Sequence, residues 1–249
     1  MKSTAELALV SLLTKHNWVS NRVLPRWAYV PYGLASSVAA VALSRRGGAS
    51  LAELGLERER ISNGVRVGAI TSTLAAAAIA TGAAIPATRR FYADDRVVHP
   101  HGATLAYEVG VRIPVGTAVV EEVLFRSALL GLLLHQRSWM SSTAWSSALF
   151  GVWHVLPAMA TISDSAALTG MSGRVGRAGA VVSAVFATTV GGIVFAELRR
   201  RSGSVVAPIL LHATVNVAAF AAARWTRTRE GDQLSPATTR PDSYATTTA

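Results

Sequence analysis

The chain is built from long apolar runs separated by short polar connectors. Each run, as an α-helix, is long enough to cross the roughly 30 Å hydrocarbon core of a bilayer. The residues within the runs do not alternate between apolar and polar, as they do in the strands of a membrane barrel. The pattern therefore predicts an all-α fold, a polytopic integral membrane helix bundle with about six transmembrane helices. The runs are residues 27–43, 64–86, 113–134, 139–160, 175–198 and 204–223.

The polar stretches beside these runs predict smaller elements. LAELGLERER, between the first two runs, carries both charge signs and is typical of a short interfacial helix. Residues 1–26 are expected to form an N-terminal interfacial segment, because their apolar stretch is too short to span a bilayer. Residues 224–249 are rich in Thr, Ser, Pro and charge, which predicts a disordered tail. Residues 27–223 then form one transmembrane domain.

The composition agrees with a membrane protein. The chain is 51% hydrophobic and 15% charged, with a positive mean hydropathy, unlike an average soluble domain. Its net charge of +10 is carried mainly by arginines that flank apolar runs, as expected for contacts with the headgroups of a lipid bilayer. Nucleic-acid binding would require a basic surface interleaved with aromatic residues, so we expect no nucleic-acid partner.

Charge and cysteine content add two further expectations. The connectors on the side that would hold both termini carry more Lys and Arg, so the positive-inside rule predicts that both termini are cytoplasmic. The strong preference for arginine suggests a bacterial protein, and hence a bacterial plasma membrane. No cysteine is present, which excludes disulfides, thiolate nucleophiles and cysteine metal ligands.

Three charged residues interrupt the third run, in AVVEEVLFRSALL, residues 118–130. A charged side chain inside a bilayer costs at least a few kcal/mol, so such residues usually face a bundle interior and mark function. Glu122 and Arg126 are four residues apart and can pair on one helical face, whereas Glu121 lies about 100° around the helix. At this point the trio could equally be a solvated patch at a helix end.

Other polar residues occur at matching depths in two later runs. His154 lies in LFGVWHVLPA, one turn after Phe150, and His212 lies in APILLHATVNVAA, one turn before Asn216. At about 1.5 Å of rise per residue, the two histidines and Glu121 come from the same side of the membrane to similar depths. We therefore expect these polar groups to meet in one leaflet.

Two imidazoles and a carboxylate are a common ligand set for zinc or a similar divalent ion. The predicted metal ligands are thus Glu121, His154 and His212. A metal held this way activates a bound water, and such a site can hydrolyse a peptide bond. Glu121 would then act as general base, and Asn216 would donate a hydrogen bond to the developing oxyanion.

Three segments carry a resemblance to a known family. EEVLFR (121–126), FGVWH (150–154) and HATVN (212–216) are similar, in this order, to the EExxxR, FxxxH and HxxxN motifs of the CPBP family of intramembrane metalloproteases. That family includes the type II CAAX prenyl proteases and bacterial bacteriocin-processing or immunity proteins. The likeness covers roughly residues 51–223. Ser127 departs from it, because many members have glycine after the arginine.

The resemblance implies an intramembrane endopeptidase that cuts membrane-associated protein or peptide substrates, with residues 27–223 as its catalytic domain. By the same resemblance, the catalytic set is Glu121, Glu122, Arg126, His154, His212 and Asn216. Glu121 would activate the attacking water, the two histidines would hold this water or a divalent metal, and Asn216 would stabilise the oxyanion. Glu122 and Arg126 would brace the site.

Three other readings stay open from the residues alone. Gly170, Ser172 and Gly173 form a GxSG arrangement similar to that of rhomboid serine proteases. Membrane carboxylates and histidines also serve as proton relays in transporters, although the chain shows no internal repeat. A protein of the same fold could instead bind a membrane partner or confer immunity without cutting anything.

Overall fold

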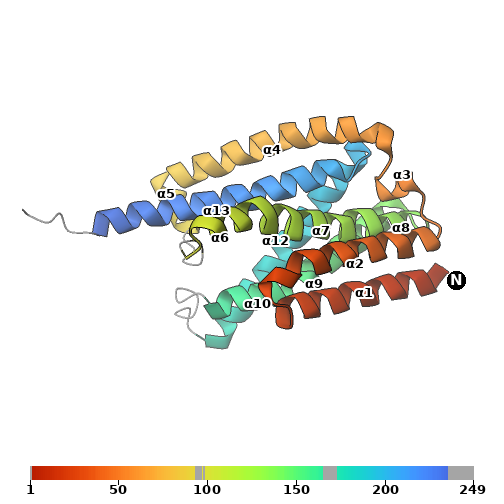
Figure 1. Cartoon of the computed structure of the whole chain (residues 1–249), viewed down its shortest axis with the longest axis horizontal. Helices are drawn as coiled ribbons and strands as arrows, with labels where there is room; N and C mark the ends of the chain where they lie inside the picture. The colour runs from red at the N-terminus through yellow and green to blue at the C-terminus, as the bar shows by residue number, and fades with distance from the viewer. Residues whose placement is uncertain (1, 93–96, 98, 165–172, 235–249) are drawn as a thin grey trace, which may run out of the picture.

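The structure is a computed structural model that describes residues 2–92, 97, 99–164 and 173–234 of the 249-residue chain. All regular elements within these residues are helices, and the long helices lie along one another in a single bundle (Figure 1). The expected all-α helix bundle is therefore confirmed.

The first half of the chain contains three long helices and several short ones. Pro25 stands at the N-cap of the second long helix and turns the chain between the first two. Ser50 and Glu53 form a capping box at the start of a short helix, which ends at Gly55 in the left-handed conformation. The elements are α1 (Lys2–Arg22), α2 (Arg26–Arg46), α3 (Leu51–Leu54), η1 (Arg58–Arg60), α4 (Ile61–Ala84), α5 (Pro86–Arg89) and η2 (Arg90–Tyr92).

The second half begins with one continuous helical stretch, residues 102–134, called the central helix below. It consists of α6 (Gly102–Tyr107), η4 (Glu108–Val119), α7 (Val120–Glu122), η5 (Val123–Leu129) and α8 (Leu130–Leu134). After it come α9 (Trp139–Trp153), α10 (Val155–Asp164), α12 (Gly173–Ser202) and α13 (Val206–Leu234). Helices thus occupy all six predicted apolar runs, and the fourth run is shared by α9 and α10.

Three helices of the described residues are long and apolar enough to cross a membrane by length and composition: Leu51–Ala84, Gly176–Ser202 and Val206–Arg229. Two of the other predicted runs differ from these three helices. The run of the central helix carries three charges, and the next run is divided at His154, where α9 ends. The structure therefore supports an integral membrane bundle in which some helices are adapted to the interior of the protein.

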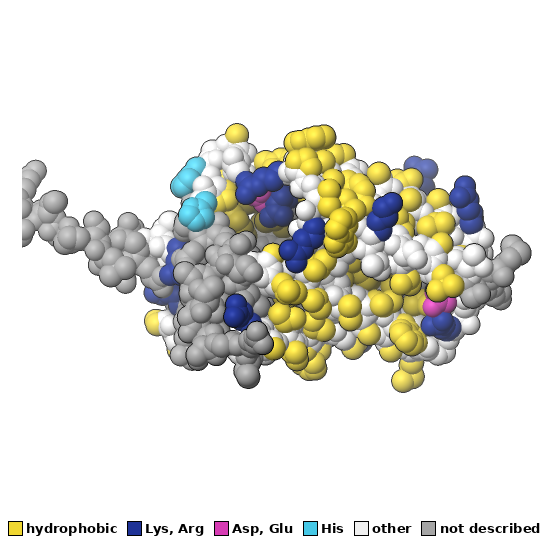
Figure 2. Space-filling model, turned by 90° about the horizontal axis from the view of Figure 1, so that it is seen from below, with side chains coloured by type: hydrophobic (Ala, Val, Ile, Leu, Met, Phe, Trp, Pro, Cys, Tyr) yellow, Lys and Arg dark blue, Asp and Glu magenta, His cyan; other side chains and the backbone are white. Residues whose placement is uncertain are grey.

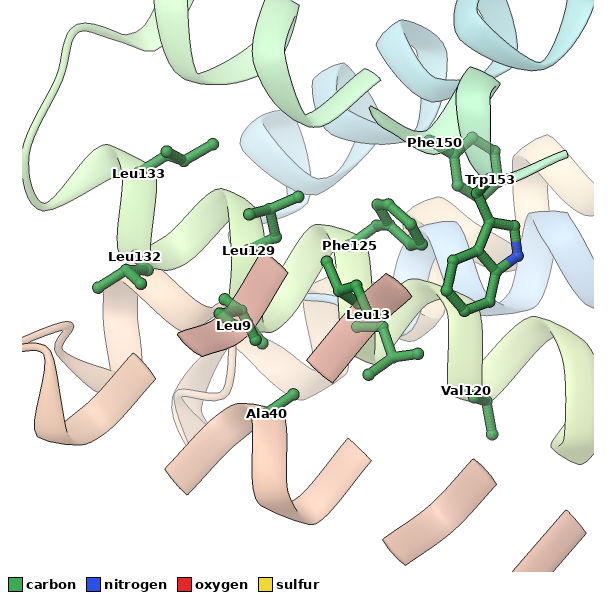
Figure 3. Close-up of a cluster of buried hydrophobic side chains, with 12 residues drawn as sticks. Leu9, Leu13, Ala40, Val120, Phe125, Leu129, Leu132, Leu133, Phe150 and Trp153 are labelled. Carbon is green, nitrogen blue, oxygen red and sulfur yellow. The ribbon is translucent and has the colours of Figure 1, made fainter. Parts of the chain in front are cut away.

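The core of the bundle surrounds the central helix. Within residues 120–133 every side chain except that of Val123 is buried. Apolar side chains of α1, α2 and α9 pack against this segment, and Figure 3 shows them gathered around its ribbon. The charges of this segment therefore lie in the protein interior, which rules out a solvated patch at a helix end.

Two segments of the central helix, η4 and η5, are π-helical. A π-helix shifts the register of side chains and of carbonyls relative to an α-helix, and such segments are frequent at functional sites. Hydroxyls of neighbouring helices bond to carbonyls of η5: Ser146 Oγ donates to Phe125 O at 3.1 Å, and Ser44 Oγ donates to Ala128 O at 3.0 Å. These bonds fix the segment that follows the two glutamates against α9 and α2.

The N-terminal segment differs from the expectation of an interfacial helix. α1 lies alongside α2, and its Leu9 and Leu13 belong to the buried core. The N-terminal end of α1 and the far end of α13 lie at opposite ends of the bundle (Figure 1). The prediction that both termini share one side of the membrane does not match this arrangement, because α1 adds a further helix along the bundle.

The C-terminal boundary also differs from the expectation. α13 continues to Leu234, so residues 224–234 of the expected disordered tail are helical. The rest of that tail, residues 235–249, lies outside the described residues.

Candidate functional site

Glu121 and the two predicted histidines meet inside the bundle. Oε2 of Glu121 lies 3.8 Å from Nε2 of His154 and 3.9 Å from Nε2 of His212. The three side chains come from α7, from the end of α9 and from α13. Glu121 is 7% exposed, and its Oε2 has no hydrogen-bond partner among the described residues. An unsatisfied carboxylate oxygen thus faces two imidazole nitrogens.

Glu122 sets the orientation of His212. Nδ1 of His212 lies 2.8 Å from Oε1 of the fully buried Glu122. An ionised carboxylate only accepts hydrogen bonds, so Nδ1 carries the proton and Nε2 presents a lone pair toward Glu121. Phe195 stacks on the imidazole with ring centroids 5.0 Å apart. A carboxylate that orients a histidine in this way fixes both its tautomer and its direction.

His154 is oriented by a backbone carbonyl at the junction of α9 and α10. Its Nδ1 lies 2.7 Å from Phe150 O, and because a carbonyl only accepts, Nδ1 is again the protonated nitrogen. The backbone N–H of His154 donates to Gly151 O at 3.0 Å, which leaves Phe150 O available to the imidazole. Pro157 accounts for the break: proline has no N–H for Trp153 O and its ring clashes with that carbonyl in a regular helix.

Arg126 balances the charge of Glu122 in a dry environment. The two side chains are 1% and 0% exposed, and Nε of Arg126 lies 3.4 Å from Oε2 of Glu122. The guanidinium carbon lies 3.9 Å from the ring centroid of Phe150 and 5.2 Å from that of Phe195, within the range of cation–π attraction. The predicted pairing of Glu122 with Arg126 is thus present, and Glu121 is the carboxylate left for another task.

Helix α12 leaves room for this arginine through a glycine. A Cβ at Gly192 would lie 3.1 Å from Nη2 of Arg126 and 3.0 Å from Cβ of Ser147. Both distances are shorter than ordinary van der Waals contact. The absence of a side chain at this position therefore lets α12 approach α9 and the central helix closely, as small residues do in membrane bundles.

A cavity of about 720 Å³ opens onto the site. Glu121, His154 and Asn216 all line it, so the structure brings the predicted oxyanion donor to the same space as the carboxylate. Arg26, Arg112 and Glu108 also line it, and Arg112 forms an ion pair with Glu108. On the face shown in Figure 2, basic side chains likewise gather around an acidic one within a largely apolar surface.

The three predicted metal ligands do not form a metal site as they stand. In tetrahedral zinc sites with bonds of about 2.0–2.1 Å, two ligand atoms lie roughly 3.3 Å apart. The distances of 3.8 and 3.9 Å from Glu121 Oε2 to the two Nε2 atoms are longer than this. Among the described residues, no group of three or more His, Cys, Asp or Glu side chains is placed to hold a metal ion.

Several residues that shape the site were not predicted from the sequence. Pro157 and the carbonyl of Phe150 orient His154, and Phe195 packs on His212. The one available signal was HVLPA, where a proline three residues after the histidine predicts a helix break. Ser172, the nucleophile of the serine-protease reading, lies outside the described residues.

The comparison with protein families agrees with this site. Residues 105–218 match the family model described as type II CAAX prenyl endopeptidase Rce1-like. This segment contains all six residues of the predicted catalytic set and most of the helices that carry them. This match confirms the resemblance indicated by the three motifs. Neither a curated protein nor a solved structure matches the chain.

Proposed function

We propose that the protein is an intramembrane endopeptidase in which Glu121 activates a water molecule to attack a peptide bond. The observation that carries the proposal is the unsatisfied, buried Oε2 of Glu121 facing the Nε2 atoms of His154 and His212. The family of residues 105–218 supports the same class of reaction.

In this mechanism the water lies between the carboxylate and the imidazoles. It donates one hydrogen bond to Glu121 and the other to His154 or His212, both of which present an acceptor nitrogen. Glu121 takes the first proton as the water oxygen forms a bond to the carbonyl carbon of the substrate. Burial strengthens these interactions, because competing solvent is largely excluded.

The negative charge that develops on the carbonyl oxygen needs a donor. Asn216 lines the same cavity, and its side-chain amide is the group we assign to this role. When the C–N bond breaks, Glu121 returns its proton to the leaving amine, and the products are a carboxylic acid and an amine, which then ionise to a carboxylate and an ammonium group. Glu122 and Arg126 take no proton; they hold His212 and balance charge.

The zinc ion expected from the sequence stays a prediction. Glu121, His154 and His212 would hold it if the three side chains moved closer together, and it would supply a more acidic water. No step of the mechanism above uses it.

The family match and the position of the site support a proposal for the substrate class. We propose that the substrates are membrane-associated proteins or peptides, which reach Glu121 through the cavity between α1, α2, α10 and α13. We further propose that the cavity end of the bundle, with the end of α13, faces the cytoplasm of a bacterium, in line with the connector charges.

A comparison of new protein termini tests the proposal in cells. Membranes from cells that express wild type or Glu121→Gln at matched levels are analysed for cleavage products. Termini that are present with wild type and lost with the variant support the proposal and reveal the cleavage sites. Identical profiles alongside a phenotype that needs the protein would favour the non-catalytic interaction or immunity reading.

A further inference from the structure

The first helix of the chain contacts the site, although it lies outside the segment that matches the family. Ser20, Asn21 and Leu24 line the cavity that contains Glu121. One turn earlier, His16 stacks between Tyr32 and Trp153, with ring centroids 5.0 and 5.5 Å apart. α1 is therefore fixed against the residue that precedes His154.

Asn17 makes the more specific contact. Its Nδ2 donates a hydrogen bond of 3.0 Å to Trp153 O. In an uninterrupted helix that carbonyl would bond to the N–H of residue 157, but Pro157 has none. A buried carbonyl without a donor is costly, and Asn17 supplies one across the bundle.

The same hydrogen bond controls the peptide plane next to His154. The carbonyl of Trp153 and the N–H of His154 belong to one rigid plane and point in opposite directions. Asn17 holds the carbonyl end, and Gly151 O accepts the N–H end at 3.0 Å. With the plane fixed, Phe150 O accepts from the Nδ1–H of His154 and not from its backbone.

Asn21 fixes the orientation of the Asn17 amide. Nδ2 of Asn21 donates to Oδ1 of Asn17 at 2.8 Å and to the Asn17 carbonyl at 2.8 Å. Oδ1 of Asn17 is thereby an acceptor, which directs the NH₂ group toward Trp153. The two asparagines thus form a chain of hydrogen bonds from the cavity wall to the backbone of the α9–α10 junction.

We propose that Asn17 is a positioning residue for His154: it holds the Trp153–His154 peptide so that Nε2 of His154 faces Glu121. This inference rests on the proposed function of His154 and adds a part of the chain, α1, that the family match does not include. Without the Asn17 donor, the peptide plane can rotate, and the backbone N–H of His154 then competes for Phe150 O.

Asn17→Asp is the variant that tests the proposal, because it keeps the size of the side chain and removes the donor. Asn63→Asp is the matched control: Nδ2 of Asn63 donates to Ser202 O at 2.8 Å, so this change also removes a part-buried bond between helices. Each purified variant is compared in lipid nanodiscs with wild type and Glu121→Gln by thermal unfolding and by cleavage kinetics on one internally quenched peptide, chosen with the wild-type protein from a randomised library.

We expect Asn17→Asp to lower kcat by about tenfold to a hundredfold, with KM changed less than about twofold, because a small misplacement of a catalytic group has effects of this size. Asn63→Asp should lose a comparable amount of thermal stability and keep its kcat. Asn17→Gln, which retains a donor, should recover part of the rate. An Asn17→Asp enzyme with wild-type kcat, or an equal loss of kcat in Asn63→Asp, would overturn the proposal.

A second measurement separates this inference from the proposed function. In protein with ¹⁵N-labelled histidine, the signals of His154, assigned by their loss in His154→Gln, report which ring nitrogen is protonated. We expect Nδ1–H in wild type and in Asn63→Asp, and a mixture of tautomers in Asn17→Asp. If Glu121→Gln cleaves like wild type, the proposed function fails, and the ¹⁵N spectrum alone tests the positioning role of Asn17. A His154 tautomer in Asn17→Asp that is the same as in wild type then refutes that role.

Discussion

Nδ1 of His212 lies 2.8 Å from Oε1 of Glu122, and Nε2 of the same ring faces Oε2 of Glu121, the preceding residue in the chain. The adjacent glutamates therefore contact opposite sides of one imidazole. Glu122 is held by Arg126 and determines the direction of the ring, and Glu121 remains available for chemistry. This division explains why a buried helix contains two neighbouring acidic residues.

The ion pair of Glu122 and Arg126 gives a prediction for stability. Glu122→Gln leaves the Arg126 guanidinium buried without its counter-charge, and Arg126→Met leaves the Glu122 carboxylate buried without its counter-charge. Each single change should destabilise the protein by about 3–5 kcal/mol. The double variant, with no unpaired charge, should be more stable than either single variant. Unfolding measured in detergent tests this, and a double variant as unstable as the sum of the singles would contradict it.

Two neighbouring glycines of α12 give a prediction for packing. A Cβ at Gly192 would contact Arg126 and Ser147 too closely, whereas nothing lies within 4 Å of a Cβ at Gly191. Gly192→Val should therefore destabilise the protein by about 1–3 kcal/mol through overpacking and displace Arg126. Gly191→Val should stay within about 1 kcal/mol of wild type, because only helix propensity changes. Equal effects on thermal unfolding would disprove the close contact.

The metal question has a direct test in purified protein. If the mechanism needs no metal, cleavage should survive prolonged treatment with a chelator, and the metal content should be well below one ion per chain. The zinc prediction expects the reverse: about one zinc per chain, lost together with activity in the double variant His154→Ala, His212→Ala. Elemental analysis alongside peptide cleavage distinguishes the two, and stoichiometric zinc would mean that the three side chains close around it.

Membrane topology is testable because the chain has no native cysteine. Single cysteines at Val23 and Thr228, both exposed, are expected to react with an impermeant maleimide from the cytoplasmic side. Arg46, also exposed, lies at the other end of α2, and a cysteine there should react only from the outside. Labelling of position 46 together with positions 23 and 228 would show that the bundle does not span the membrane in this direction.

The sequence predicted the parts of this structure that depend on local patterns. Apolar runs predicted the long helices, because burial or lipid contact requires them. The four-residue spacing predicted the contact between Glu122 and Arg126, since it depends only on helix geometry. Counting residues from the helix ends placed Glu121, His154 and His212 at similar depths, and the structure brings each imidazole within 4 Å of the Glu121 carboxylate.

What the sequence did not predict depends on contacts between distant segments. The π-helical geometry around the glutamates is accompanied by bonds from Ser44 and Ser146, which no local pattern reveals. The apolar stretch of α1, bounded by Glu6 and Lys15, is too short to predict a place in the bundle, and only the tertiary fold shows that Leu9 and Leu13 are buried. The contact between Asn17 and Trp153 joins residues 136 positions apart, so only the tertiary fold shows it.

The central claim, that Glu121 is the general base of a peptidase, is tested most directly by cleavage kinetics of the purified protein in lipid nanodiscs. Glu121→Gln keeps the shape of the side chain and removes its basicity. Glu197→Gln is the matched control, because Glu197 pairs with Arg200 and Arg201 at the end of α12, away from the cavity. We predict that Glu121→Gln lowers kcat by about a hundredfold or more, while Glu197→Gln cleaves like wild type. Equal cleavage by Glu121→Gln and wild type would contradict the mechanism.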